Sequence, residues 1–328
     1  MRFRNLFTPF CIVAVFLVSC TNSRTRFYDA SVDNDTLQIK VERFDLDLFT
    51  LDTASLAAKY GDFLKLYTHN ILNLRSSDEL YKFTTDSGIM QLHSDVERIY
   101  PAEGGASEAE KSLTTAFRYY HRYFPDNEIP RVMFHISGFN QAMVVTDKVV
   151  SASVEQYLGA DYEPYQYVAY SYEIPFMTPQ QLPVDMMYAW ISSSFPETLQ
   201  GEQLLDFMIY QGKLLYLQKV FFPDTAESAL LGYTESQYEW CKRFESEVWN
   251  HIMESRELFS TDWKVYTKYI SPAPFTSGLS QESPGRIGIY IGLQMVKSYM
   301  DRNENVTLQE LMKSSDSRMF LQSAAYRP

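Results

Sequence analysis

Histidine and cysteine are the residues that most often carry metal or nucleophilic chemistry, and here their spacing argues against the common sites. The five histidines are His69, His93, His121, His135 and His251, and no two of them lie four residues apart. A helix therefore cannot present the two imidazoles of an H-E-x-x-H motif to zinc. The sequence also lacks the G-x-S-x-G, P-loop, G-x-G-x-x-G and C-x-x-C motifs. We therefore expect no catalytic residue, no metal site and no cofactor.

Arg286 is a candidate for binding an anion. It ends the segment Ser283-Pro-Gly-Arg, directly before an apolar stretch with helical spacing. Free amides at a helix start attract anions, and a guanidinium can clamp a carboxylate. The alternative, which the sequence favours, is an N-terminal turn in which Arg286 pairs with an internal acid such as Asp262.

A tyrosine-rich stretch from Tyr157 to Tyr172 is the best candidate for a contact surface. Tyr165, Tyr167 and Tyr170 lie within it. Tyrosine combines a large apolar ring with one polar tip, which suits surfaces that touch peptides or partner proteins. The alternative is that these rings close over the neighbouring strands as part of the core.

The N-terminus has the features of an export signal with a lipid anchor. Arg2 and Arg4 precede an apolar run over residues 10–18, which is too short to span a bilayer as a permanent helix. The run ends in Leu17-Val-Ser-Cys, which resembles the bacterial lipobox. That resemblance implies that residues 1–19 are a signal peptide and that Cys20 receives acyl chains such as palmitate. Two or three chains hold a protein on a membrane almost indefinitely.

Composition excludes several classes of function. Residues 1–19 contain two of the 29 basic residues and none of the 41 acidic ones, so the mature chain has 27 basic and 41 acidic residues, a net charge of −14. Nucleic-acid binding and electrostatic adhesion to anionic lipid are therefore not expected. Cys241 is the one cysteine left besides Cys20, so no intrachain disulfide is expected. The polar residues 20–36 are interpreted as a linker from the lipid to a domain.

Hydrophobic periodicity predicts one α+β domain over residues 37–328, mostly helical, with a small antiparallel sheet. Alternating apolar residues predict strands over residues 37–44, 131–136, 142–146 and 149–154. Spacings of three and four predict helices over residues 53–67, 108–124, 184–193, 202–220, 235–254 and 287–300. Thr307-Leu-Gln-Glu310 has the pattern of a capping box at a further helix start.

Several longer segments resemble one known family. They are Ile136-Ser-Gly-Phe-Asn, Met208-Ile-Tyr-Gln-Gly-Lys-Leu-Leu-Tyr, Gln237-Tyr-Glu-Trp-Cys, Phe259-Ser-Thr-Asp, Ala273-Pro-Phe and Ser283-Pro-Gly-Arg-Ile-Gly-Ile-Tyr-Ile-Gly. In this order, and with the lipobox, they resemble the gliding-motility lipoprotein family GldB of the Bacteroidota. The resemblance covers essentially the whole mature chain. It implies an envelope lipoprotein associated with gliding machinery, although relatives also occur in species that do not glide.

A more distant resemblance, to zincin-type metallopeptidases, bears on mechanism. It rests on the order of a hairpin sheet, a helix and a second helix with the pattern Leu-Leu-x-x-x-Ile-x-x-Gly. The resemblance implies that Val184 and Tyr188 stand where histidine ligands would be. Asp185 then stands at the general-base position and Gln211 at the third ligand position. Valine has no donor atom, and a phenol or an amide is a poor zinc ligand, so this resemblance implies a degenerate site without metal.

In the zincin arrangement a substrate strand lies against a sheet edge. We therefore expect a groove between residues 136–154 and 184–190 to hold an extended segment of a partner, with Tyr165, Tyr167 and Tyr170 in its aromatic wall. The simpler alternative is that the helix predicted over residues 184–193 is an ordinary core helix.

Together these inferences predict a membrane-anchored, noncatalytic envelope lipoprotein, a catalytically inactive relative of zinc metallopeptidases that contributes a folded surface to a protein assembly. Its expected partners are the membrane, through lipid at Cys20, and other envelope proteins. Thr21-Asn-Ser-Arg lacks the acidic run that resembles a surface-export signal, so the domain is expected to face the periplasm. The alternatives are an envelope peptidase or other hydrolase, and a ligand-binding lipoprotein with a deep pocket lined by residues 157–172.

Overall fold

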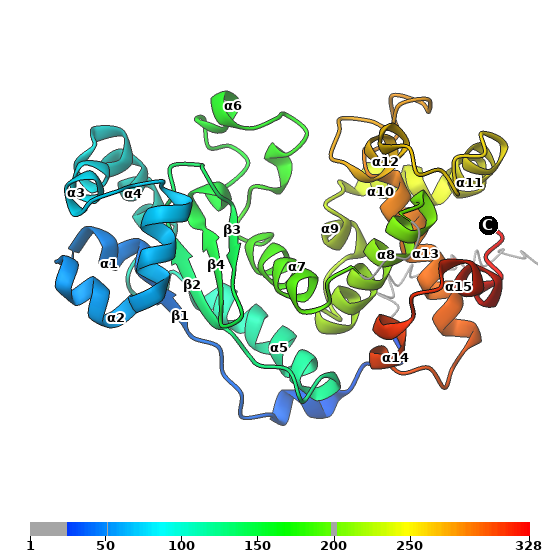
Figure 1. Cartoon of the computed structure of the whole chain (residues 1–328), viewed down its shortest axis with the longest axis horizontal. Coiled ribbons are helices and arrows are strands. Elements are labelled where there is room, and N and C mark those ends of the chain that lie inside the picture. Colours follow the sequence, from blue (N-terminus) through cyan, green and yellow to red (C-terminus); the bar gives the residue numbers. More distant parts are fainter. Residues whose placement is uncertain (1–24, 51, 198–201) are drawn as a thin grey trace, which may run out of the picture.

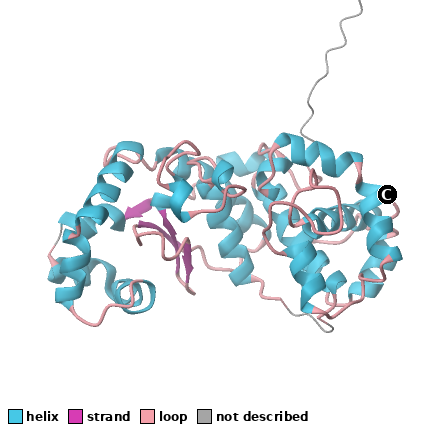
Figure 2. Cartoon of the chain, turned by 90° about the horizontal axis from the view of Figure 1, so that it is seen from above, coloured by secondary structure: helices cyan, strands magenta, loops and turns pink. Residues whose placement is uncertain are grey.

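The computed structural model describes residues 25–50, 52–197 and 202–328. The predicted signal peptide over residues 1–19 and the predicted lipidation site at Cys20 lie outside these residues. Within them the chain is mostly helical with one small sheet, so the predicted α+β class and single domain are confirmed. Figure 2 shows the strands gathered in one half of the molecule and the other half built from helices.

Four short strands form one mixed sheet in the order β1-β2-β4-β3 (Figure 1). They are β1 (Val41–Arg43), β2 (Arg131–His135), β3 (Met143–Val145) and β4 (Val149–Ser153). β1 is parallel to β2, and β2 is parallel to β4, whereas β3 at the edge is antiparallel to β4. The predicted antiparallel pairing is therefore confirmed for β3 with β4 and corrected for the other two pairs.

The connections and the burial of the strands explain this topology. Parallel strands need a long crossover, and between β1 and β2 it is supplied by five helices. These are α1 (Phe44–Thr50), α2 (Thr53–Leu66), α3 (Ser77–Thr85), α4 (Ser87–Ile99) and α5 (Ser107–Tyr123). In β2, Met133 packs with the apolar residues of α1 and α2, while Val132 and Phe134 join the main core on the other face. A strand buried on both faces carries no alternation from which its orientation can be inferred.

The strand predicted over residues 37–44 is shorter in the structure, because backbone amides at its start bond side chains of helix α5 and not a neighbouring strand. The Ile39 amide donates to Thr114 Oγ1 at 3.0 Å and the Val41 amide donates to Glu110 Oε1 at 3.0 Å. Pairing in the sheet is left to residues 41–43.

Helices follow the sheet. They are α6 (Tyr165–Val168), α7 (Leu182–Ser194), α8 (Leu204–Phe221), α9 (Glu227–Leu231), α10 (Glu235–Arg243), α11 (Glu245–Glu254), α12 (Trp263–Ile270), α13 (Ile287–Arg302), α14 (Leu308–Lys313) and α15 (Ser317–Ala324). The helix predicted over 235–254 is two helices that meet at Phe244. The capping box of Thr307 and Glu310 is confirmed at the start of α14.

Glycines let α8 and α13 cross closely at the centre of the helical half. A Cβ on Gly292 would collide with the carbonyl of Met208, and one on Gly212 would collide with the backbone of Gly292. This contact fixes α13, and with it the residue directly before it, Arg286, relative to α8. Helix α7 contacts β3 and β4 and also contacts α8, so it joins the sheet to the helical half (Figure 1).

The segment predicted as a linker over residues 20–36 packs against the domain where it is described. Arg26 donates to the carbonyl of Met300 and, at 2.8 Å, to that of Val306. The ring of Phe27 lies edge-on to Tyr123 at 5.5 Å, and Val32 is buried. The folded domain therefore begins by residue 26 and not at residue 37. Over the described parts of the chain, no helix is long and apolar enough to cross a membrane.

Candidate functional site

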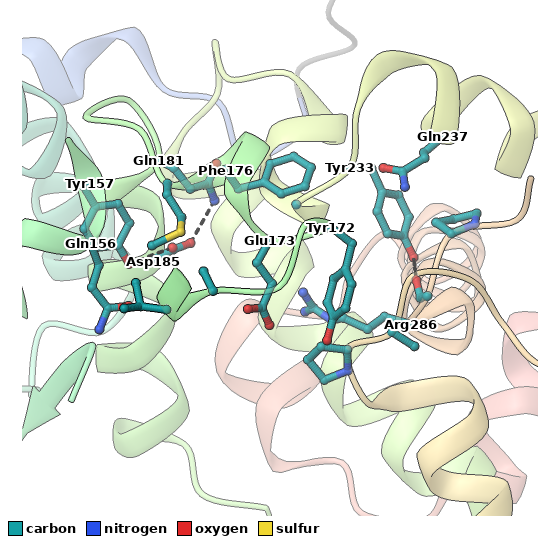
Figure 3. A pocket seen from close by; sticks show the side chains of 18 of the residues that line it. Gln156, Tyr157, Tyr172, Glu173, Phe176, Gln181, Asp185, Tyr233, Gln237 and Arg286 are labelled. Carbon is teal, nitrogen blue, oxygen red and sulfur yellow. Dashed lines mark hydrogen bonds between the residues drawn. The ribbon is translucent and has the colours of Figure 1, made fainter. Parts of the chain in front are cut away.

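A pocket of about 360 Å³ lies where the two halves of the molecule meet. Its walls come from the tyrosine-rich segment, the start of α7, the α9–α10 connection and the loop before α13 (Figure 3). The polar side chains that line it are Gln156, Tyr157, Tyr172, Glu173, Gln181, Asp185, Tyr233, Gln237 and Arg286. Two residues that the sequence singled out for separate reasons, Asp185 and Arg286, thus share one pocket.

Asp185 lies in the first turn of α7 and is held by two donors. Gln181 Nε2 donates to Oδ1 at 2.8 Å, and the Tyr157 hydroxyl donates to Oδ2 at 2.9 Å. Burial raises the pKa of Asp185, while these two hydrogen bonds and the charge of Arg286 act in the opposite direction. The carboxyl group is therefore fixed in orientation and already has partners for both oxygens.

Arg286 lies at the N-cap of α13 with φ of 60°. The loop before it is held in place, because the Tyr233 hydroxyl donates to the Gly285 carbonyl at 2.8 Å and Thr276 Oγ1 donates to the Pro284 carbonyl at 2.7 Å. A Cβ on Gly285 would collide with Ala273, so only glycine allows this close approach. The backbone of Arg286 is therefore positioned by contacts that do not involve its guanidinium.

The predicted pairing of Arg286 with Asp262 is wrong. Asp262 instead caps α12, accepting from the Lys264 amide at 2.9 Å. Within the described residues, the guanidinium of Arg286 has no hydrogen bond and no ion pair. A Cβ placed on Gly232 would lie 3.8 Å from Arg286 Nη1, which puts the guanidinium beside the α9–α10 connection.

The positions derived from the zincin resemblance lie on α7 and α8, and two of them, Tyr188 and Gln211, interact through their side chains. The Tyr188 hydroxyl donates to Gln211 Oε1, and burial raises the pKa of Tyr188. The Val184 side chain is buried, and its carbonyl accepts from Gln218 Nε2 at 2.8 Å. Among the described residues, no three histidine, cysteine, aspartate or glutamate side chains lie close enough together to hold a metal ion.

The three tyrosines predicted to form one surface divide into two groups. Tyr165 is 0% exposed, accepts from the Leu158 amide at 2.8 Å and donates to the Glu155 carbonyl at 2.9 Å. Its assignment to a partner surface is therefore corrected, since its hydroxyl satisfies backbone groups inside the core. Tyr167 and Tyr170 are 80% and 68% exposed, and Tyr170 stacks on Tyr172 with ring centroids 5.4 Å apart.

The groove predicted between residues 136–154 and 184–190 differs from the observed pocket. Only Phe139 from the first range and Asp185 from the second line it among the described residues. Helix α7 packs directly against β3 and β4, and most of the lining comes from the tyrosine-rich segment and the C-terminal half. Glu173, Gln181 and Tyr233 line the pocket without having been singled out, because no motif marks them.

Fold and site together define an α+β protein with a preformed pocket of mixed polarity, beside a helix that lacks a metal-ligand motif. The family of the gliding motility protein GldB matches residues 27–328, and the chain belongs to this family. The match begins where the chain first packs onto the domain, and it confirms the family inferred from the sequence. No curated protein and no solved structure matches the chain.

Proposed function

We propose that this chain is a lipid-anchored, noncatalytic component of a protein assembly in the bacterial envelope. Membership of the GldB family supports a role connected with gliding motility. The lipobox pattern ending in Cys20 supports anchoring by lipid, and the lack of an acidic run after it supports a periplasmic orientation. Other envelope proteins are the expected partners.

The observation that carries the noncatalytic part of this proposal is the chemistry at the start of α7. Val184 and Tyr188 lie one turn apart, where a metallopeptidase helix would carry two histidines, and Tyr188 is bonded to Gln211. Asp185, at the general-base position, is held by Tyr157 and Gln181. In the proposed degenerate zincin-like frame, α7 is the former metal-binding helix, and it packs against β3 and β4. We propose that this frame now binds a partner segment without cleaving it.

The exposed tyrosines beside the pocket are the proposed contact surface for a partner protein. Tyr167 and Val168 belong to α6, which projects from the body of the molecule at the top of Figure 1. Tyr170 follows directly and stacks on Tyr172, which lines the pocket. Exposed aromatic rings of this kind are enriched where proteins bind one another.

Crosslinking in living cells followed by copurification tests this role. Tyr167→Ser together with Tyr170→Ser should abolish capture of the copurifying envelope proteins, with an unchanged thermal midpoint since both rings are exposed. Tyr81→Ser on α3 is the matched control, because Tyr81 is 69% exposed and lies on another element. Capture that survives the double substitution would place the interface elsewhere.

A second function, ligand binding, is favoured by the pocket itself. A volume of about 360 Å³ falls within the range of small-molecule sites, and its polar groups converge from four separate segments.

A further inference from the structure

We propose that the pocket binds the C-terminal carboxylate of a short peptide segment, with Arg286 as the residue that holds the carboxylate. This inference rests on the proposed noncatalytic function, because a cleaving site would release such a segment.

The charge of Arg286 points to an anionic ligand. Among the described residues that line the pocket, Arg286 is the one cation. It is partly buried, and within the described residues it has neither a hydrogen bond nor an ion pair. A guanidinium at a partly buried position gains most from a planar group that takes two parallel hydrogen bonds. A carboxylate is such a group.

The two acidic residues of the pocket, Asp185 and Glu173, do not occupy the place beside the Arg286 guanidinium where a ligand carboxylate would bind. Both oxygens of Asp185 accept from Gln181 and Tyr157, and no hydrogen bond or ion pair joins this carboxyl to Arg286, although the charge of Arg286 acts on it. Glu173 lines the pocket but forms no ion pair with Arg286. In Figure 3 the side chains of Tyr172, Glu173 and Arg286 point into the same space. A carboxyl oxygen of Glu173 can accept a peptide N–H next to a carboxylate held by Arg286.

The walls favour a peptide over a simple anion. Tyr172, Phe176 and Met177 present apolar surface on one side. Gln156 lines the pocket, and no described residue hydrogen-bonds its amide group, which offers one acceptor and two donors. A backbone amide needs one donor and one acceptor, so Gln156 matches a peptide unit. A bare inorganic anion would leave these walls and most of the volume unused.

The site is organised before the ligand arrives. Tyr233 and Thr276 hold the loop that ends at Arg286, and Gly285 packs against Ala273. Helix α13 is in turn fixed on α8 through Gly292. Little ordering of the backbone is needed on binding, which favours affinity for a small ligand.

The test is calorimetric titration of the full mature chain with N-acetyl-Ala-Ala-Leu and with its C-terminal amide. We expect the acid to bind at least about tenfold more tightly, since hydrogen bonds to a charged group are the stronger ones. Arg286→Gln should remove this preference by weakening the acid alone. Arg256→Gln is the matched control, because Arg256 has a similar φ of 57° and is exposed outside the pocket. It should leave both affinities unchanged.

A second variant keeps the test decisive if Arg286→Gln does not fold. Ala169 lines the pocket, so Ala169→Trp should block binding of the acid while leaving the circular dichroism spectrum unchanged. Equal binding of acid and amide, or no binding of the acid, would overturn the inference. If free leucine bound as tightly as N-acetyl-Ala-Ala-Leu, the ligand would be a small carboxylate and not a peptide, and the inference would be overturned. Cleavage of the acid would instead contradict the noncatalytic function, so the two failures are distinguishable.

Discussion

Tyr165 allows the folding role of the tyrosine-rich segment to be separated from its binding role. Its hydroxyl is the partner of the Leu158 amide and the Glu155 carbonyl, both inside the core. Tyr165→Phe keeps the ring but leaves both backbone groups without that partner. An unsatisfied buried polar group costs about 1–3 kcal/mol. We therefore expect Tyr165→Phe to lower the free energy of unfolding by about 3 kcal/mol.

Tyr165→Ala also removes the ring, which lies against Phe139 and Tyr162 with centroids 6.3 and 5.0 Å away. Truncating a buried aromatic side chain costs about 3–5 kcal/mol. Together with the lost hydrogen bonds, the change should reach about 5 kcal/mol or more, a large part of the stability of a typical domain.

Urea unfolding at 25 °C, followed by far-ultraviolet circular dichroism, measures these differences. The matched control is Tyr167→Phe, since Tyr167 is two residues away in the same segment and 80% exposed. It should change the unfolding free energy by less than about 0.5 kcal/mol. If Tyr165→Phe proves as mild as Tyr167→Phe, the hydroxyl does not bridge the two backbone groups and the reasoning is refuted.

Two further predictions concern pH and the anchor. Burial lowers the pKa of His135 from 6.5 to about 4, so between these pH values the unfolded chain binds a proton that the native chain does not. The stabilising contribution of neutral His135 is present above pH 6.5 and is lost as the pH falls. The free energy of unfolding of wild type should therefore fall by about 3 kcal/mol relative to that of His135→Asn between pH 7 and pH 4. Denaturant titrations that give the same pH dependence for both proteins would contradict this. Cys20→Ala should abolish incorporation of radiolabelled palmitate, and equal labelling of variant and wild type would exclude the lipobox.

Part of the helical structure could be predicted from the sequence, because several helices carry apolar residues at spacings of three and four, whereas α3, α4, α12 and α15 were missed. The pattern over residues 108–124 and the capping box at Thr307 correspond to an observed helix and an observed cap. The break at Phe244 could not be predicted, because apolar spacing continues from α10 into α11. The parallel order of β1, β2 and β4 was also hidden, since β2 is buried on both faces and the crossover is a tertiary feature.

The sequence predicted some of the residues of the site, but it did not predict which segments of the chain come together to form the pocket. Asp185 and Arg286 were both singled out, but nothing in the sequence shows that α7 and the loop before α13 share a pocket. The sequence also allowed Arg286 to pair with Asp262, but in the structure Asp262 caps α12. Tyr165 and Tyr167 lie in one four-residue helix, too short for periodicity to distinguish the buried ring from the exposed one.

We propose that helix α7 forms part of a binding site that carries no metal. Elemental analysis of the purified mature chain, after equilibration with zinc and dialysis, tests it most directly. The residues at positions 184, 188 and 211 supply no set of nitrogen, thiolate or carboxylate ligands. We predict far less than about one zinc ion per chain, the stoichiometry of a single tetrahedral site. About one ion per chain, lost on Asp185→Ala or Tyr188→Phe, would contradict the account.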